Sequence, residues 1–188
     1  MSKRRAADIM FYIMTRTGAT ALLEWTYRNY SFDADLQIVH ADVRIAWNGD
    51  VWAEEPLCID VGLPALAASL TDNTEPNRFA DPVRDWRAMP FLVCGCGDPE
   101  CRGLSFAVRH LPGGRVRISQ LEERPGREPR LLAEAELPLA ELREAVERIA
   151  EDYLRFVEPL DYRPLLSAAP ELVRDALRRA KLGDGDHA

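Results

Sequence analysis

Histidine and cysteine are scarce in this chain, and the short motifs that mark common catalytic centres are missing. There are three histidines and four cysteines among 188 residues. The sequence contains no glycine-rich phosphate loop, no His-Glu-x-x-His zinc motif and no Gly-x-Ser-x-Gly nucleophile motif. A nucleophilic enzyme needs a base beside its cysteine or serine. His187 falls in the predicted tail, and His40 and His110 fall in predicted strands, where we expect structural roles. The sequence therefore favours a protein that is not an enzyme.

Long apolar runs and an excess of positive charge are also missing. No run approaches the ~20 apolar residues that a membrane-spanning helix needs. The 24 basic residues are outnumbered by 31 acidic ones, and the net charge is −7. Such a surface repels phosphate backbones and anionic lipids. We therefore expect neither nucleic acid nor membrane as a partner, and a basic protein is favoured instead. The apolar run at 9–14 is too short for a secretory signal, so we expect a cytoplasmic protein with reduced cysteines.

Apolar residues make up 47% of the chain, which is enough for a folded core. We predict a single α+β domain over residues 1–182, followed by a flexible tail at 183–188. Hairpin-like strands followed by helices indicate a mostly antiparallel sheet, with C-terminal amphipathic helices packed on one face.

The predicted elements follow from hydrophobic periodicity and from turn residues. Residues 8–30 form an apolar start that fits either strand or helix. Asn48-Gly49 predicts a tight hairpin, because both residues tolerate positive φ. Residues 71–90 read as a polar loop with a helical turn near 84–87. We predict strands at 35–47, 51–61, 104–110, 115–121 and 131–137, and helices at 64–70, 138–157 and 170–182.

Three of the four cysteines, Cys94, Cys96 and Cys101, lie within eight residues. Residues two apart on a strand share a face, and a four-residue turn at 97–100 would place Cys96 opposite Cys101. Three sulfurs would then converge on one patch, as a tetrahedral zinc site requires. Three interpretations stay open: a zinc site, buried free thiols, and a redox disulfide between Cys96 and Cys101.

A zinc site needs a fourth ligand, and the cysteine segment does not supply an obvious one. Cys58 or His40 would have to approach from a neighbouring strand, and Asp98 lies close in the sequence. His110 is nine residues beyond Cys101, about 30 Å along a straight strand, which is too far.

The predicted helix at 138–157 carries the strongest local charge imbalance. Residues 134–158 hold eight acidic residues against three arginines. A basic partner could meet the acidic residues, although pairs such as Glu144–Arg148 and Glu151–Arg155 also suit a solvated helix face. Trp86, set among charged residues of the polar loop, is a second candidate anchor. The predicted partner-binding residues are Glu141, Glu144, Glu151, Asp152 and Trp86.

The second half of the chain resembles small bacterial immunity-like proteins. The resemblance rests on the Cys-x-Cys-Gly and following cysteine at 94–101, the strands over 104–121 and the helix at 138–157. It implies a binding protein that neutralises a toxin. The alternative from a different class is a small metal-dependent or thiol enzyme, or a zinc-stabilised regulatory module, built on Cys94, Cys96 and Cys101.

Overall fold

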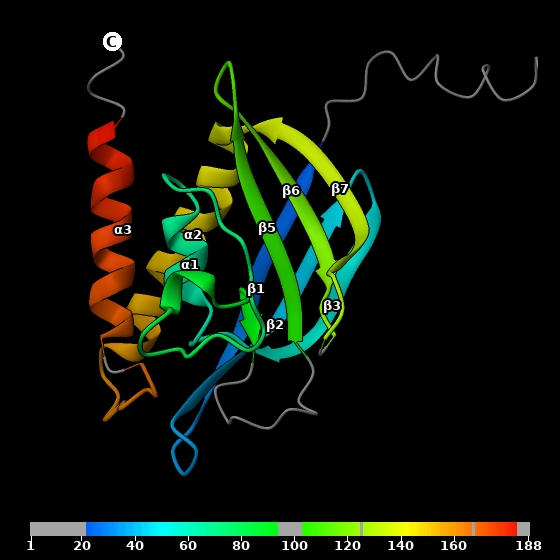
Figure 1. Cartoon of the computed structure of the whole chain (residues 1–188). Coiled ribbons are helices and arrows are strands. Elements are labelled where there is room, and N and C mark those ends of the chain that lie inside the picture. Colours follow the sequence, from blue (N-terminus) through cyan, green and yellow to red (C-terminus); the bar gives the residue numbers. More distant parts are fainter. Residues whose placement is uncertain (1–21, 94–102, 125, 167, 184–188) are drawn as a thin grey trace, which may run out of the picture.

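Two antiparallel sheets face each other in the computed structural model, which describes residues 22–93, 103–124, 126–166 and 168–183. The first sheet has the order β1-β2-β3, from β1 (Leu23–Asp33), β2 (Ile38–Trp47) and β3 (Asp50–Cys58). The second has the order β4-β5-β6-β7, from β4 (Leu92–Val93), β5 (Gly103–Leu111), β6 (Arg115–Glu122) and β7 (Arg130–Pro138). Figure 1 shows β5 and β6 in front of β1 and β2. The prediction of an α+β fold with antiparallel sheets is confirmed.

The β2–β3 hairpin forms where the sequence predicts it. Asn48 and Gly49 both have positive φ, 51° and 88°, as a tight reversal requires. The start of β2 differs from the prediction. Asp33 accepts hydrogen bonds from the backbone N–H groups of Asp35 and Leu36, so these residues form a turn and the strand begins at Ile38. Leu36, expected on the strand, is exposed in that turn.

The sequence left residues 8–30 open between strand and helix. The part of this range that the structure describes belongs to the strand β1 from Leu23 onwards. Its inward side chains do not keep a period of two. Trp25 and Tyr27 are buried, but the pairing with β2 shifts between Arg28 and Ser31, and the next side chains to pack against the core are Tyr30 and Phe32. The bulge explains why the sequence pattern is ambiguous.

Aromatic side chains join the two sheets. The Trp25 ring on β1 lies 5.3 Å from Phe106 on β5 and 6.1 Å from Phe91, centroid to centroid. Trp52 on β3 stacks 6.4 Å from Phe106. Gln120 on β6 donates a hydrogen bond to the Trp52 carbonyl oxygen. One continuous core therefore links both sheets and the helices.

Three α-helices flank the sheets among the described residues: α1 (Leu63–Ala68), α2 (Leu139–Val157) and α3 (Ala169–Gly183). α2 contacts β1, β6 and β7, and it buries Leu142, Val146, Ile149 and Tyr153, the apolar side of the predicted amphipathic helix. α3 forms an outer layer against α1 and α2 (Figure 1). The predicted helical turn in the polar loop is the 3-10 helix η1 (Trp86–Ala88).

The start of α1 packs unusually close to the segment that enters β4. A Cβ atom on Gly62 would lie far inside contact distance of the backbone oxygens of Pro90 and Phe91. Because these are backbone atoms, no side-chain rotation relieves the clash. Glycine at 62 lets α1 and β4 meet.

Candidate functional site

The predicted acidic residues lie along the outer part of α2. Glu144 and Glu151 are exposed, while Glu141 and Asp152 are half-buried at its flanks. The helix repeat brings other acidic residues into the same strip. We call this strip the acidic face of α2, formed by Glu141, Glu144, Glu147, Glu151, Asp152 and the C-cap residue Glu158.

The arginines of α2 do not pair as the sequence predicts. Arg148 donates to the Trp25 carbonyl oxygen at 3.3 Å instead of pairing with Glu144. Arg155 contacts Asp152 at 2.8 Å instead of Glu151, whose carboxylate lies 3.7 Å from the Lys181 ammonium. The predicted i,i+4 pairs are therefore wrong: contacts with β1 and α3 take Arg148 and Glu151, and Arg155 pairs with Asp152 of its own helix.

Part of the acidic face consequently lacks a compensating charge. Among the described residues, Glu144, Glu147 and Glu158 have no ion-pair partner. Arg143 donates to the Ala180 carbonyl oxygen at 2.8 Å, near the end of α3. Carboxylates that lack an internal partner remain available to cations from another molecule.

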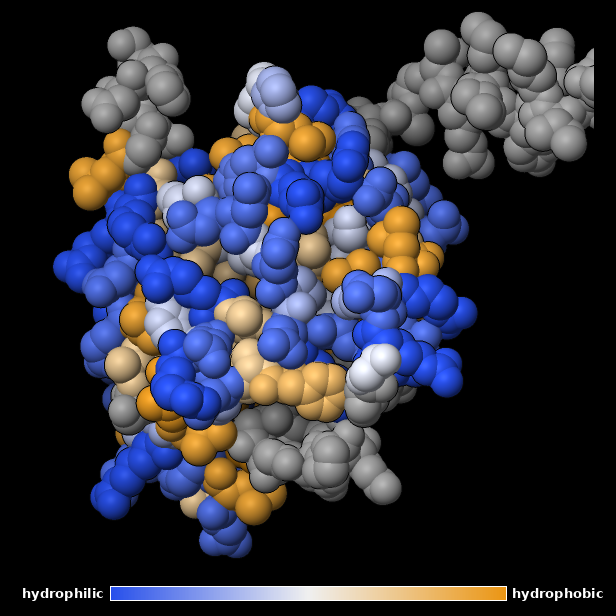
Figure 2. All heavy atoms as spheres, in the orientation of Figure 1, coloured by the Kyte–Doolittle hydropathy of each residue, from blue (hydrophilic) through white to orange (hydrophobic). Residues whose placement is uncertain are grey.

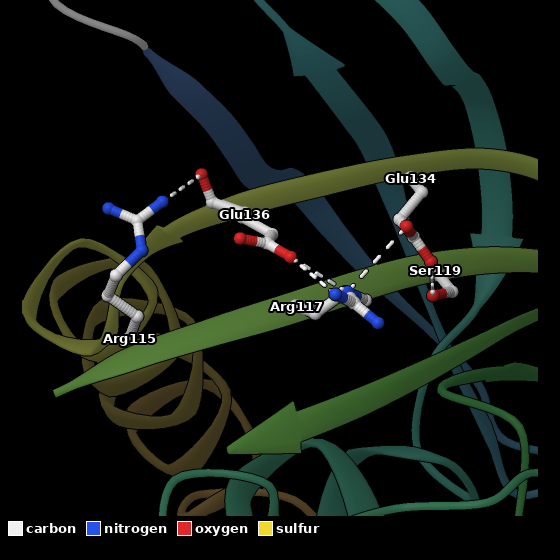
Figure 3. Close-up of polar contacts among 5 residues, drawn as sticks. All are labelled: Arg115, Arg117, Ser119, Glu134 and Glu136. Carbon is white, nitrogen blue, oxygen red and sulfur yellow. Dashed lines mark hydrogen bonds and ion pairs between the residues drawn. The ribbon is translucent and has the colours of Figure 1, made fainter. Parts of the chain in front are cut away.

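The arginines of β6 and β7 differ from those of α2, because they contact groups of their own sheet. On β6, Arg117 contacts Glu136 of β7 at 2.6 Å and Glu134 at 3.6 Å (Figure 3). Ser119 donates to Glu134, and Arg115 donates to the Glu136 carbonyl oxygen (Figure 3). Hydrogen bonding to Glu136 raises the pKa of Arg117. This ladder covers the outer side of the second sheet.

Trp86, the other predicted anchor, lies in η1 and is half-buried. The Arg87 guanidinium sits 4.5 Å from the centre of its ring, which is a cation–π contact. Trp86 also lines a groove against α3 that no local sequence signal indicates. None of the described residues that line this groove belongs to the acidic face of α2.

The structure describes only two of the candidate zinc ligands, His40 and Cys58. Cys94, Cys96 and Cys101, and the predicted turn between them, lie outside the described residues. His40 and Cys58 are direct partners across β2 and β3, on the side of the sheet opposite Val39 and Ala41. Among the described residues, no group of three histidine, cysteine or acidic side chains could hold a metal ion.

β4 and β5 pair antiparallel, as the predicted turn at 97–100 requires of the segments on either side of it. Val93 pairs with Gly103. A regular hairpin with Cys96 opposite Cys101 would pair Val93 with Leu104, so the observed register differs from the predicted one by one residue. His110 has a structural contact, because its Nε2 lies 2.9 Å from the Ser69 carbonyl oxygen.

A buried polar cluster around Asp60 is the site that sequence reasoning missed. Asp60 is 1% exposed and accepts hydrogen bonds from the Tyr162 hydroxyl at 2.9 Å and from the Val61 N–H at 2.9 Å. The Tyr153 hydroxyl contacts that of Tyr162 at 3.3 Å, and the Val39 N–H reaches Asp60 at 3.4 Å. Asp60 and Tyr162 are 102 residues apart, so no local pattern reveals their contact.

Burial dominates the electrostatics of this cluster. Desolvation raises the pKa of Asp60, and the hydrogen bond from Tyr162 opposes that rise. Burial and the nearby Asp60 carboxylate raise the pKa of Tyr162. The cluster ties the end of β3 to α2 and to the segment before α3, which is a structural role.

Comparisons with known proteins add no identification: no protein family, curated protein or solved structure matches this chain. Among the described residues, none of the helices is both long and apolar enough to cross a membrane.

Proposed function

We propose that this chain is a cytosolic protein-binding protein that neutralises a toxin or another basic protein, and that the acidic face of α2 is its contact surface. The orientation of the charges on α2 supports this most directly. Glu144, Glu147 and Glu158 have no ion-pair partner among the described residues, whereas Arg148 is directed to a backbone carbonyl and Arg155 to Asp152.

This arrangement of charges favours a basic partner. The whole chain carries a net charge of −7. Its overall electric field therefore attracts cations, in addition to the attraction of the local carboxylates. Lysines or arginines from a partner would meet carboxylates without first breaking internal ion pairs. Complementary charge mainly accelerates association and selects the partner. The resemblance to immunity-like proteins agrees with this function.

The test reverses two exposed acidic residues of α2 and compares them with two elsewhere. Glu144→Lys with Glu151→Lys changes the acidic face. Asp35→Lys with Glu128→Lys makes the same charge change at exposed positions of a turn and a loop. Each variant and the wild type is used to capture partners from the source organism. We expect the wild type and the control to retain a basic protein that the α2 variant loses.

Two further measurements make this test specific. Circular dichroism should show all variants folded, because exposed ion pairs contribute only ~0–1 kcal/mol. Association of the retained partner should slow markedly between ~50 and ~500 mM salt. Equal capture by both double variants, or a rate that does not respond to salt, would show that α2 is merely a solvated helix.

A zinc-stabilised module is the second candidate, and the placement of His40 and Cys58 favours it. They are cross-strand partners, and β3, which ends at Cys58, contacts β4, the strand before the cysteine segment. Protein purified without chelator should then contain about one zinc per chain, and Cys58→Ser or His40→Ala should lower that content. Metal-free wild-type protein would eliminate this candidate.

A further inference from the structure

A groove between η1 and α3 has the opposite electrostatic character from the acidic face of α2. Its volume is about 570 Å³, within the ~300–1,000 Å³ range of binding pockets. We call it the α3 groove. It is lined by Trp86, Arg87, Leu172, Asp175, Arg178, Arg179 and Leu182.

The α3 groove has large apolar side chains that the fold leaves accessible. Leu182 is 77% exposed, the highest fraction among the large hydrophobic residues that the structure describes, and Leu172 and Trp86 are half-buried. Leu172 and Leu182 lie on the same side of α3, separated by helical spacings of three, four and three residues. Figure 2 shows the α3 side as mainly hydrophilic, with hydrophobic patches between the charged side chains.

Arginines dominate the charged lining of the groove. Arg87 lies over the Trp86 ring, Arg178 pairs with Asp175, and Arg179 lies 3.5 Å from Asp72. These are exposed pairs, which contribute little and exchange readily with carboxylates from another molecule. Three arginines line the groove against Asp175 and the neighbouring Asp72, so one positive charge is left over on a chain that is negative overall.

We propose that the α3 groove binds an acidic peptide segment of another protein that presents a large apolar side chain. The apolar side chain would pack on Trp86, Leu172 and Leu182 while flanking carboxylates contact Arg178 and Arg179. Tryptophan and arginine are the side chains that most often carry binding energy at protein interfaces. This surface is additional to the acidic face of α2 and selects a partner of opposite charge.

Two other occupants fit the groove less well. A small inorganic anion would satisfy the arginines but would leave the apolar lining in water. A second copy of this chain could offer its acidic face of α2, but Leu154 and Phe156 of that helix already pack against the core. An acidic segment with its own apolar anchor satisfies both parts of the lining.

The experiment titrates the whole chain into a fluorescein-labelled synthetic peptide and follows anisotropy. The probe has leucine or phenylalanine at i, i+3 and i+7 and glutamate elsewhere, the spacing by which a helix fills a groove. One control peptide replaces its apolar residues with serine, and another replaces glutamate with lysine. We expect saturable binding of the probe and at least ~tenfold weaker binding of either control.

Substitutions in the α3 groove then test whether the probe binds there. Leu182→Glu and Trp86→Ala should each weaken probe binding about tenfold, and Leu182→Glu should leave thermal stability unchanged because this side chain is exposed. Arg178→Glu with Arg179→Glu should weaken it similarly. The same double reversal at Arg124 and Arg163, exposed arginines on other segments, should change it no more than about twofold.

Several results would overturn the proposal. If the serine peptide binds as tightly as the probe, binding depends on charge alone and needs no apolar anchor. If the lysine peptide binds as tightly as the probe, the arginines do not select an acidic segment. Wild-type protein that dimerises through Leu182 and ignores the probe would identify a second copy as the occupant. Glu144→Lys with Glu151→Lys should not weaken probe binding, so failure here and failure of the proposed function can be told apart.

Discussion

Replacing Tyr162 with phenylalanine removes one hydroxyl from the buried cluster around Asp60. Asp60 would keep the Val61 N–H at 2.9 Å, but the Oδ2 atom would retain only the Val39 N–H at 3.4 Å. A hydrogen bond to a charged group contributes about 1.5–3 kcal/mol, and one between neutral groups about 0.5–1.5 kcal/mol. The free energy of unfolding should therefore fall by about 2 kcal/mol when Asp60 is ionised.

The size of this loss should depend on pH, and its sign follows from the pKa of Asp60. Burial raises that pKa in the folded state, so the folded chain holds the proton more tightly than the unfolded chain. The contribution of Asp60 to stability is therefore greatest at low pH and falls as the pH rises from ~4 through the folded-state pKa. Phenylalanine at 162 removes a hydrogen bond that lowers this pKa, so the loss of stability should deepen as the pH rises.

Urea unfolding of wild type and Tyr162→Phe at about pH 5 and about pH 8 measures the effect. Tyr30→Phe is the matched control, because its hydroxyl lies 3.4 Å from the Ile149 carbonyl oxygen, which does not titrate. We expect a small loss for Tyr30→Phe that is equal at both pH values. A loss for Tyr162→Phe that is equally insensitive to pH, or below ~0.5 kcal/mol at pH 8, would refute the reasoning.

The remaining predictions concern one close backbone approach and one exposed ion pair. Gly62→Ala should lower the free energy of unfolding by ~2–3 kcal/mol or more, because its Cβ meets backbone oxygens that cannot rotate away; an unchanged urea midpoint would mean that α1 and β4 separate easily. Arg117→Ala should leave the midpoint unchanged, since Arg117 and its partners Glu134 and Glu136 are all about 40% exposed. A clear drop in the midpoint would instead show that the ladder in Figure 3 acts as a cooperative network.

Local signals predicted the elements whose pattern is set by their own residues. The positive φ values at Asn48 and Gly49 are a property of those residue types, and the buried stripe of α2 follows directly from the helical repeat. β1 resisted prediction because its bulge spaces Trp25, Tyr27, Tyr30 and Phe32 by two, three and two residues. That spacing mixes the periods of strand and helix.

Candidate sites were harder to predict because they depend on contacts between distant segments. Acidic residues could be assigned to α2 from sequence. Sequence could not show that Glu144 has no ion-pair partner among the described residues, because Arg148 donates instead to the Trp25 carbonyl oxygen on β1. The sequence predicted Trp86 as an anchor but not the groove that it lines, since Leu172 and Leu182 come from a helix more than eighty residues further along. The cluster at Asp60 has no local signature at all.

The close contact at Gly62 has an evolutionary consequence. Asp60 is constrained by its buried hydrogen bonds. Gly62 is constrained by backbone oxygens, which leave no space for a Cβ atom. Surface residues such as Arg117 can be replaced during evolution. Asp60 and Gly62, which come just before α1, should be conserved together with Tyr162, 102 residues after Asp60. Distant relatives should therefore be recognisable by this framework even where their partner-binding residues have diverged.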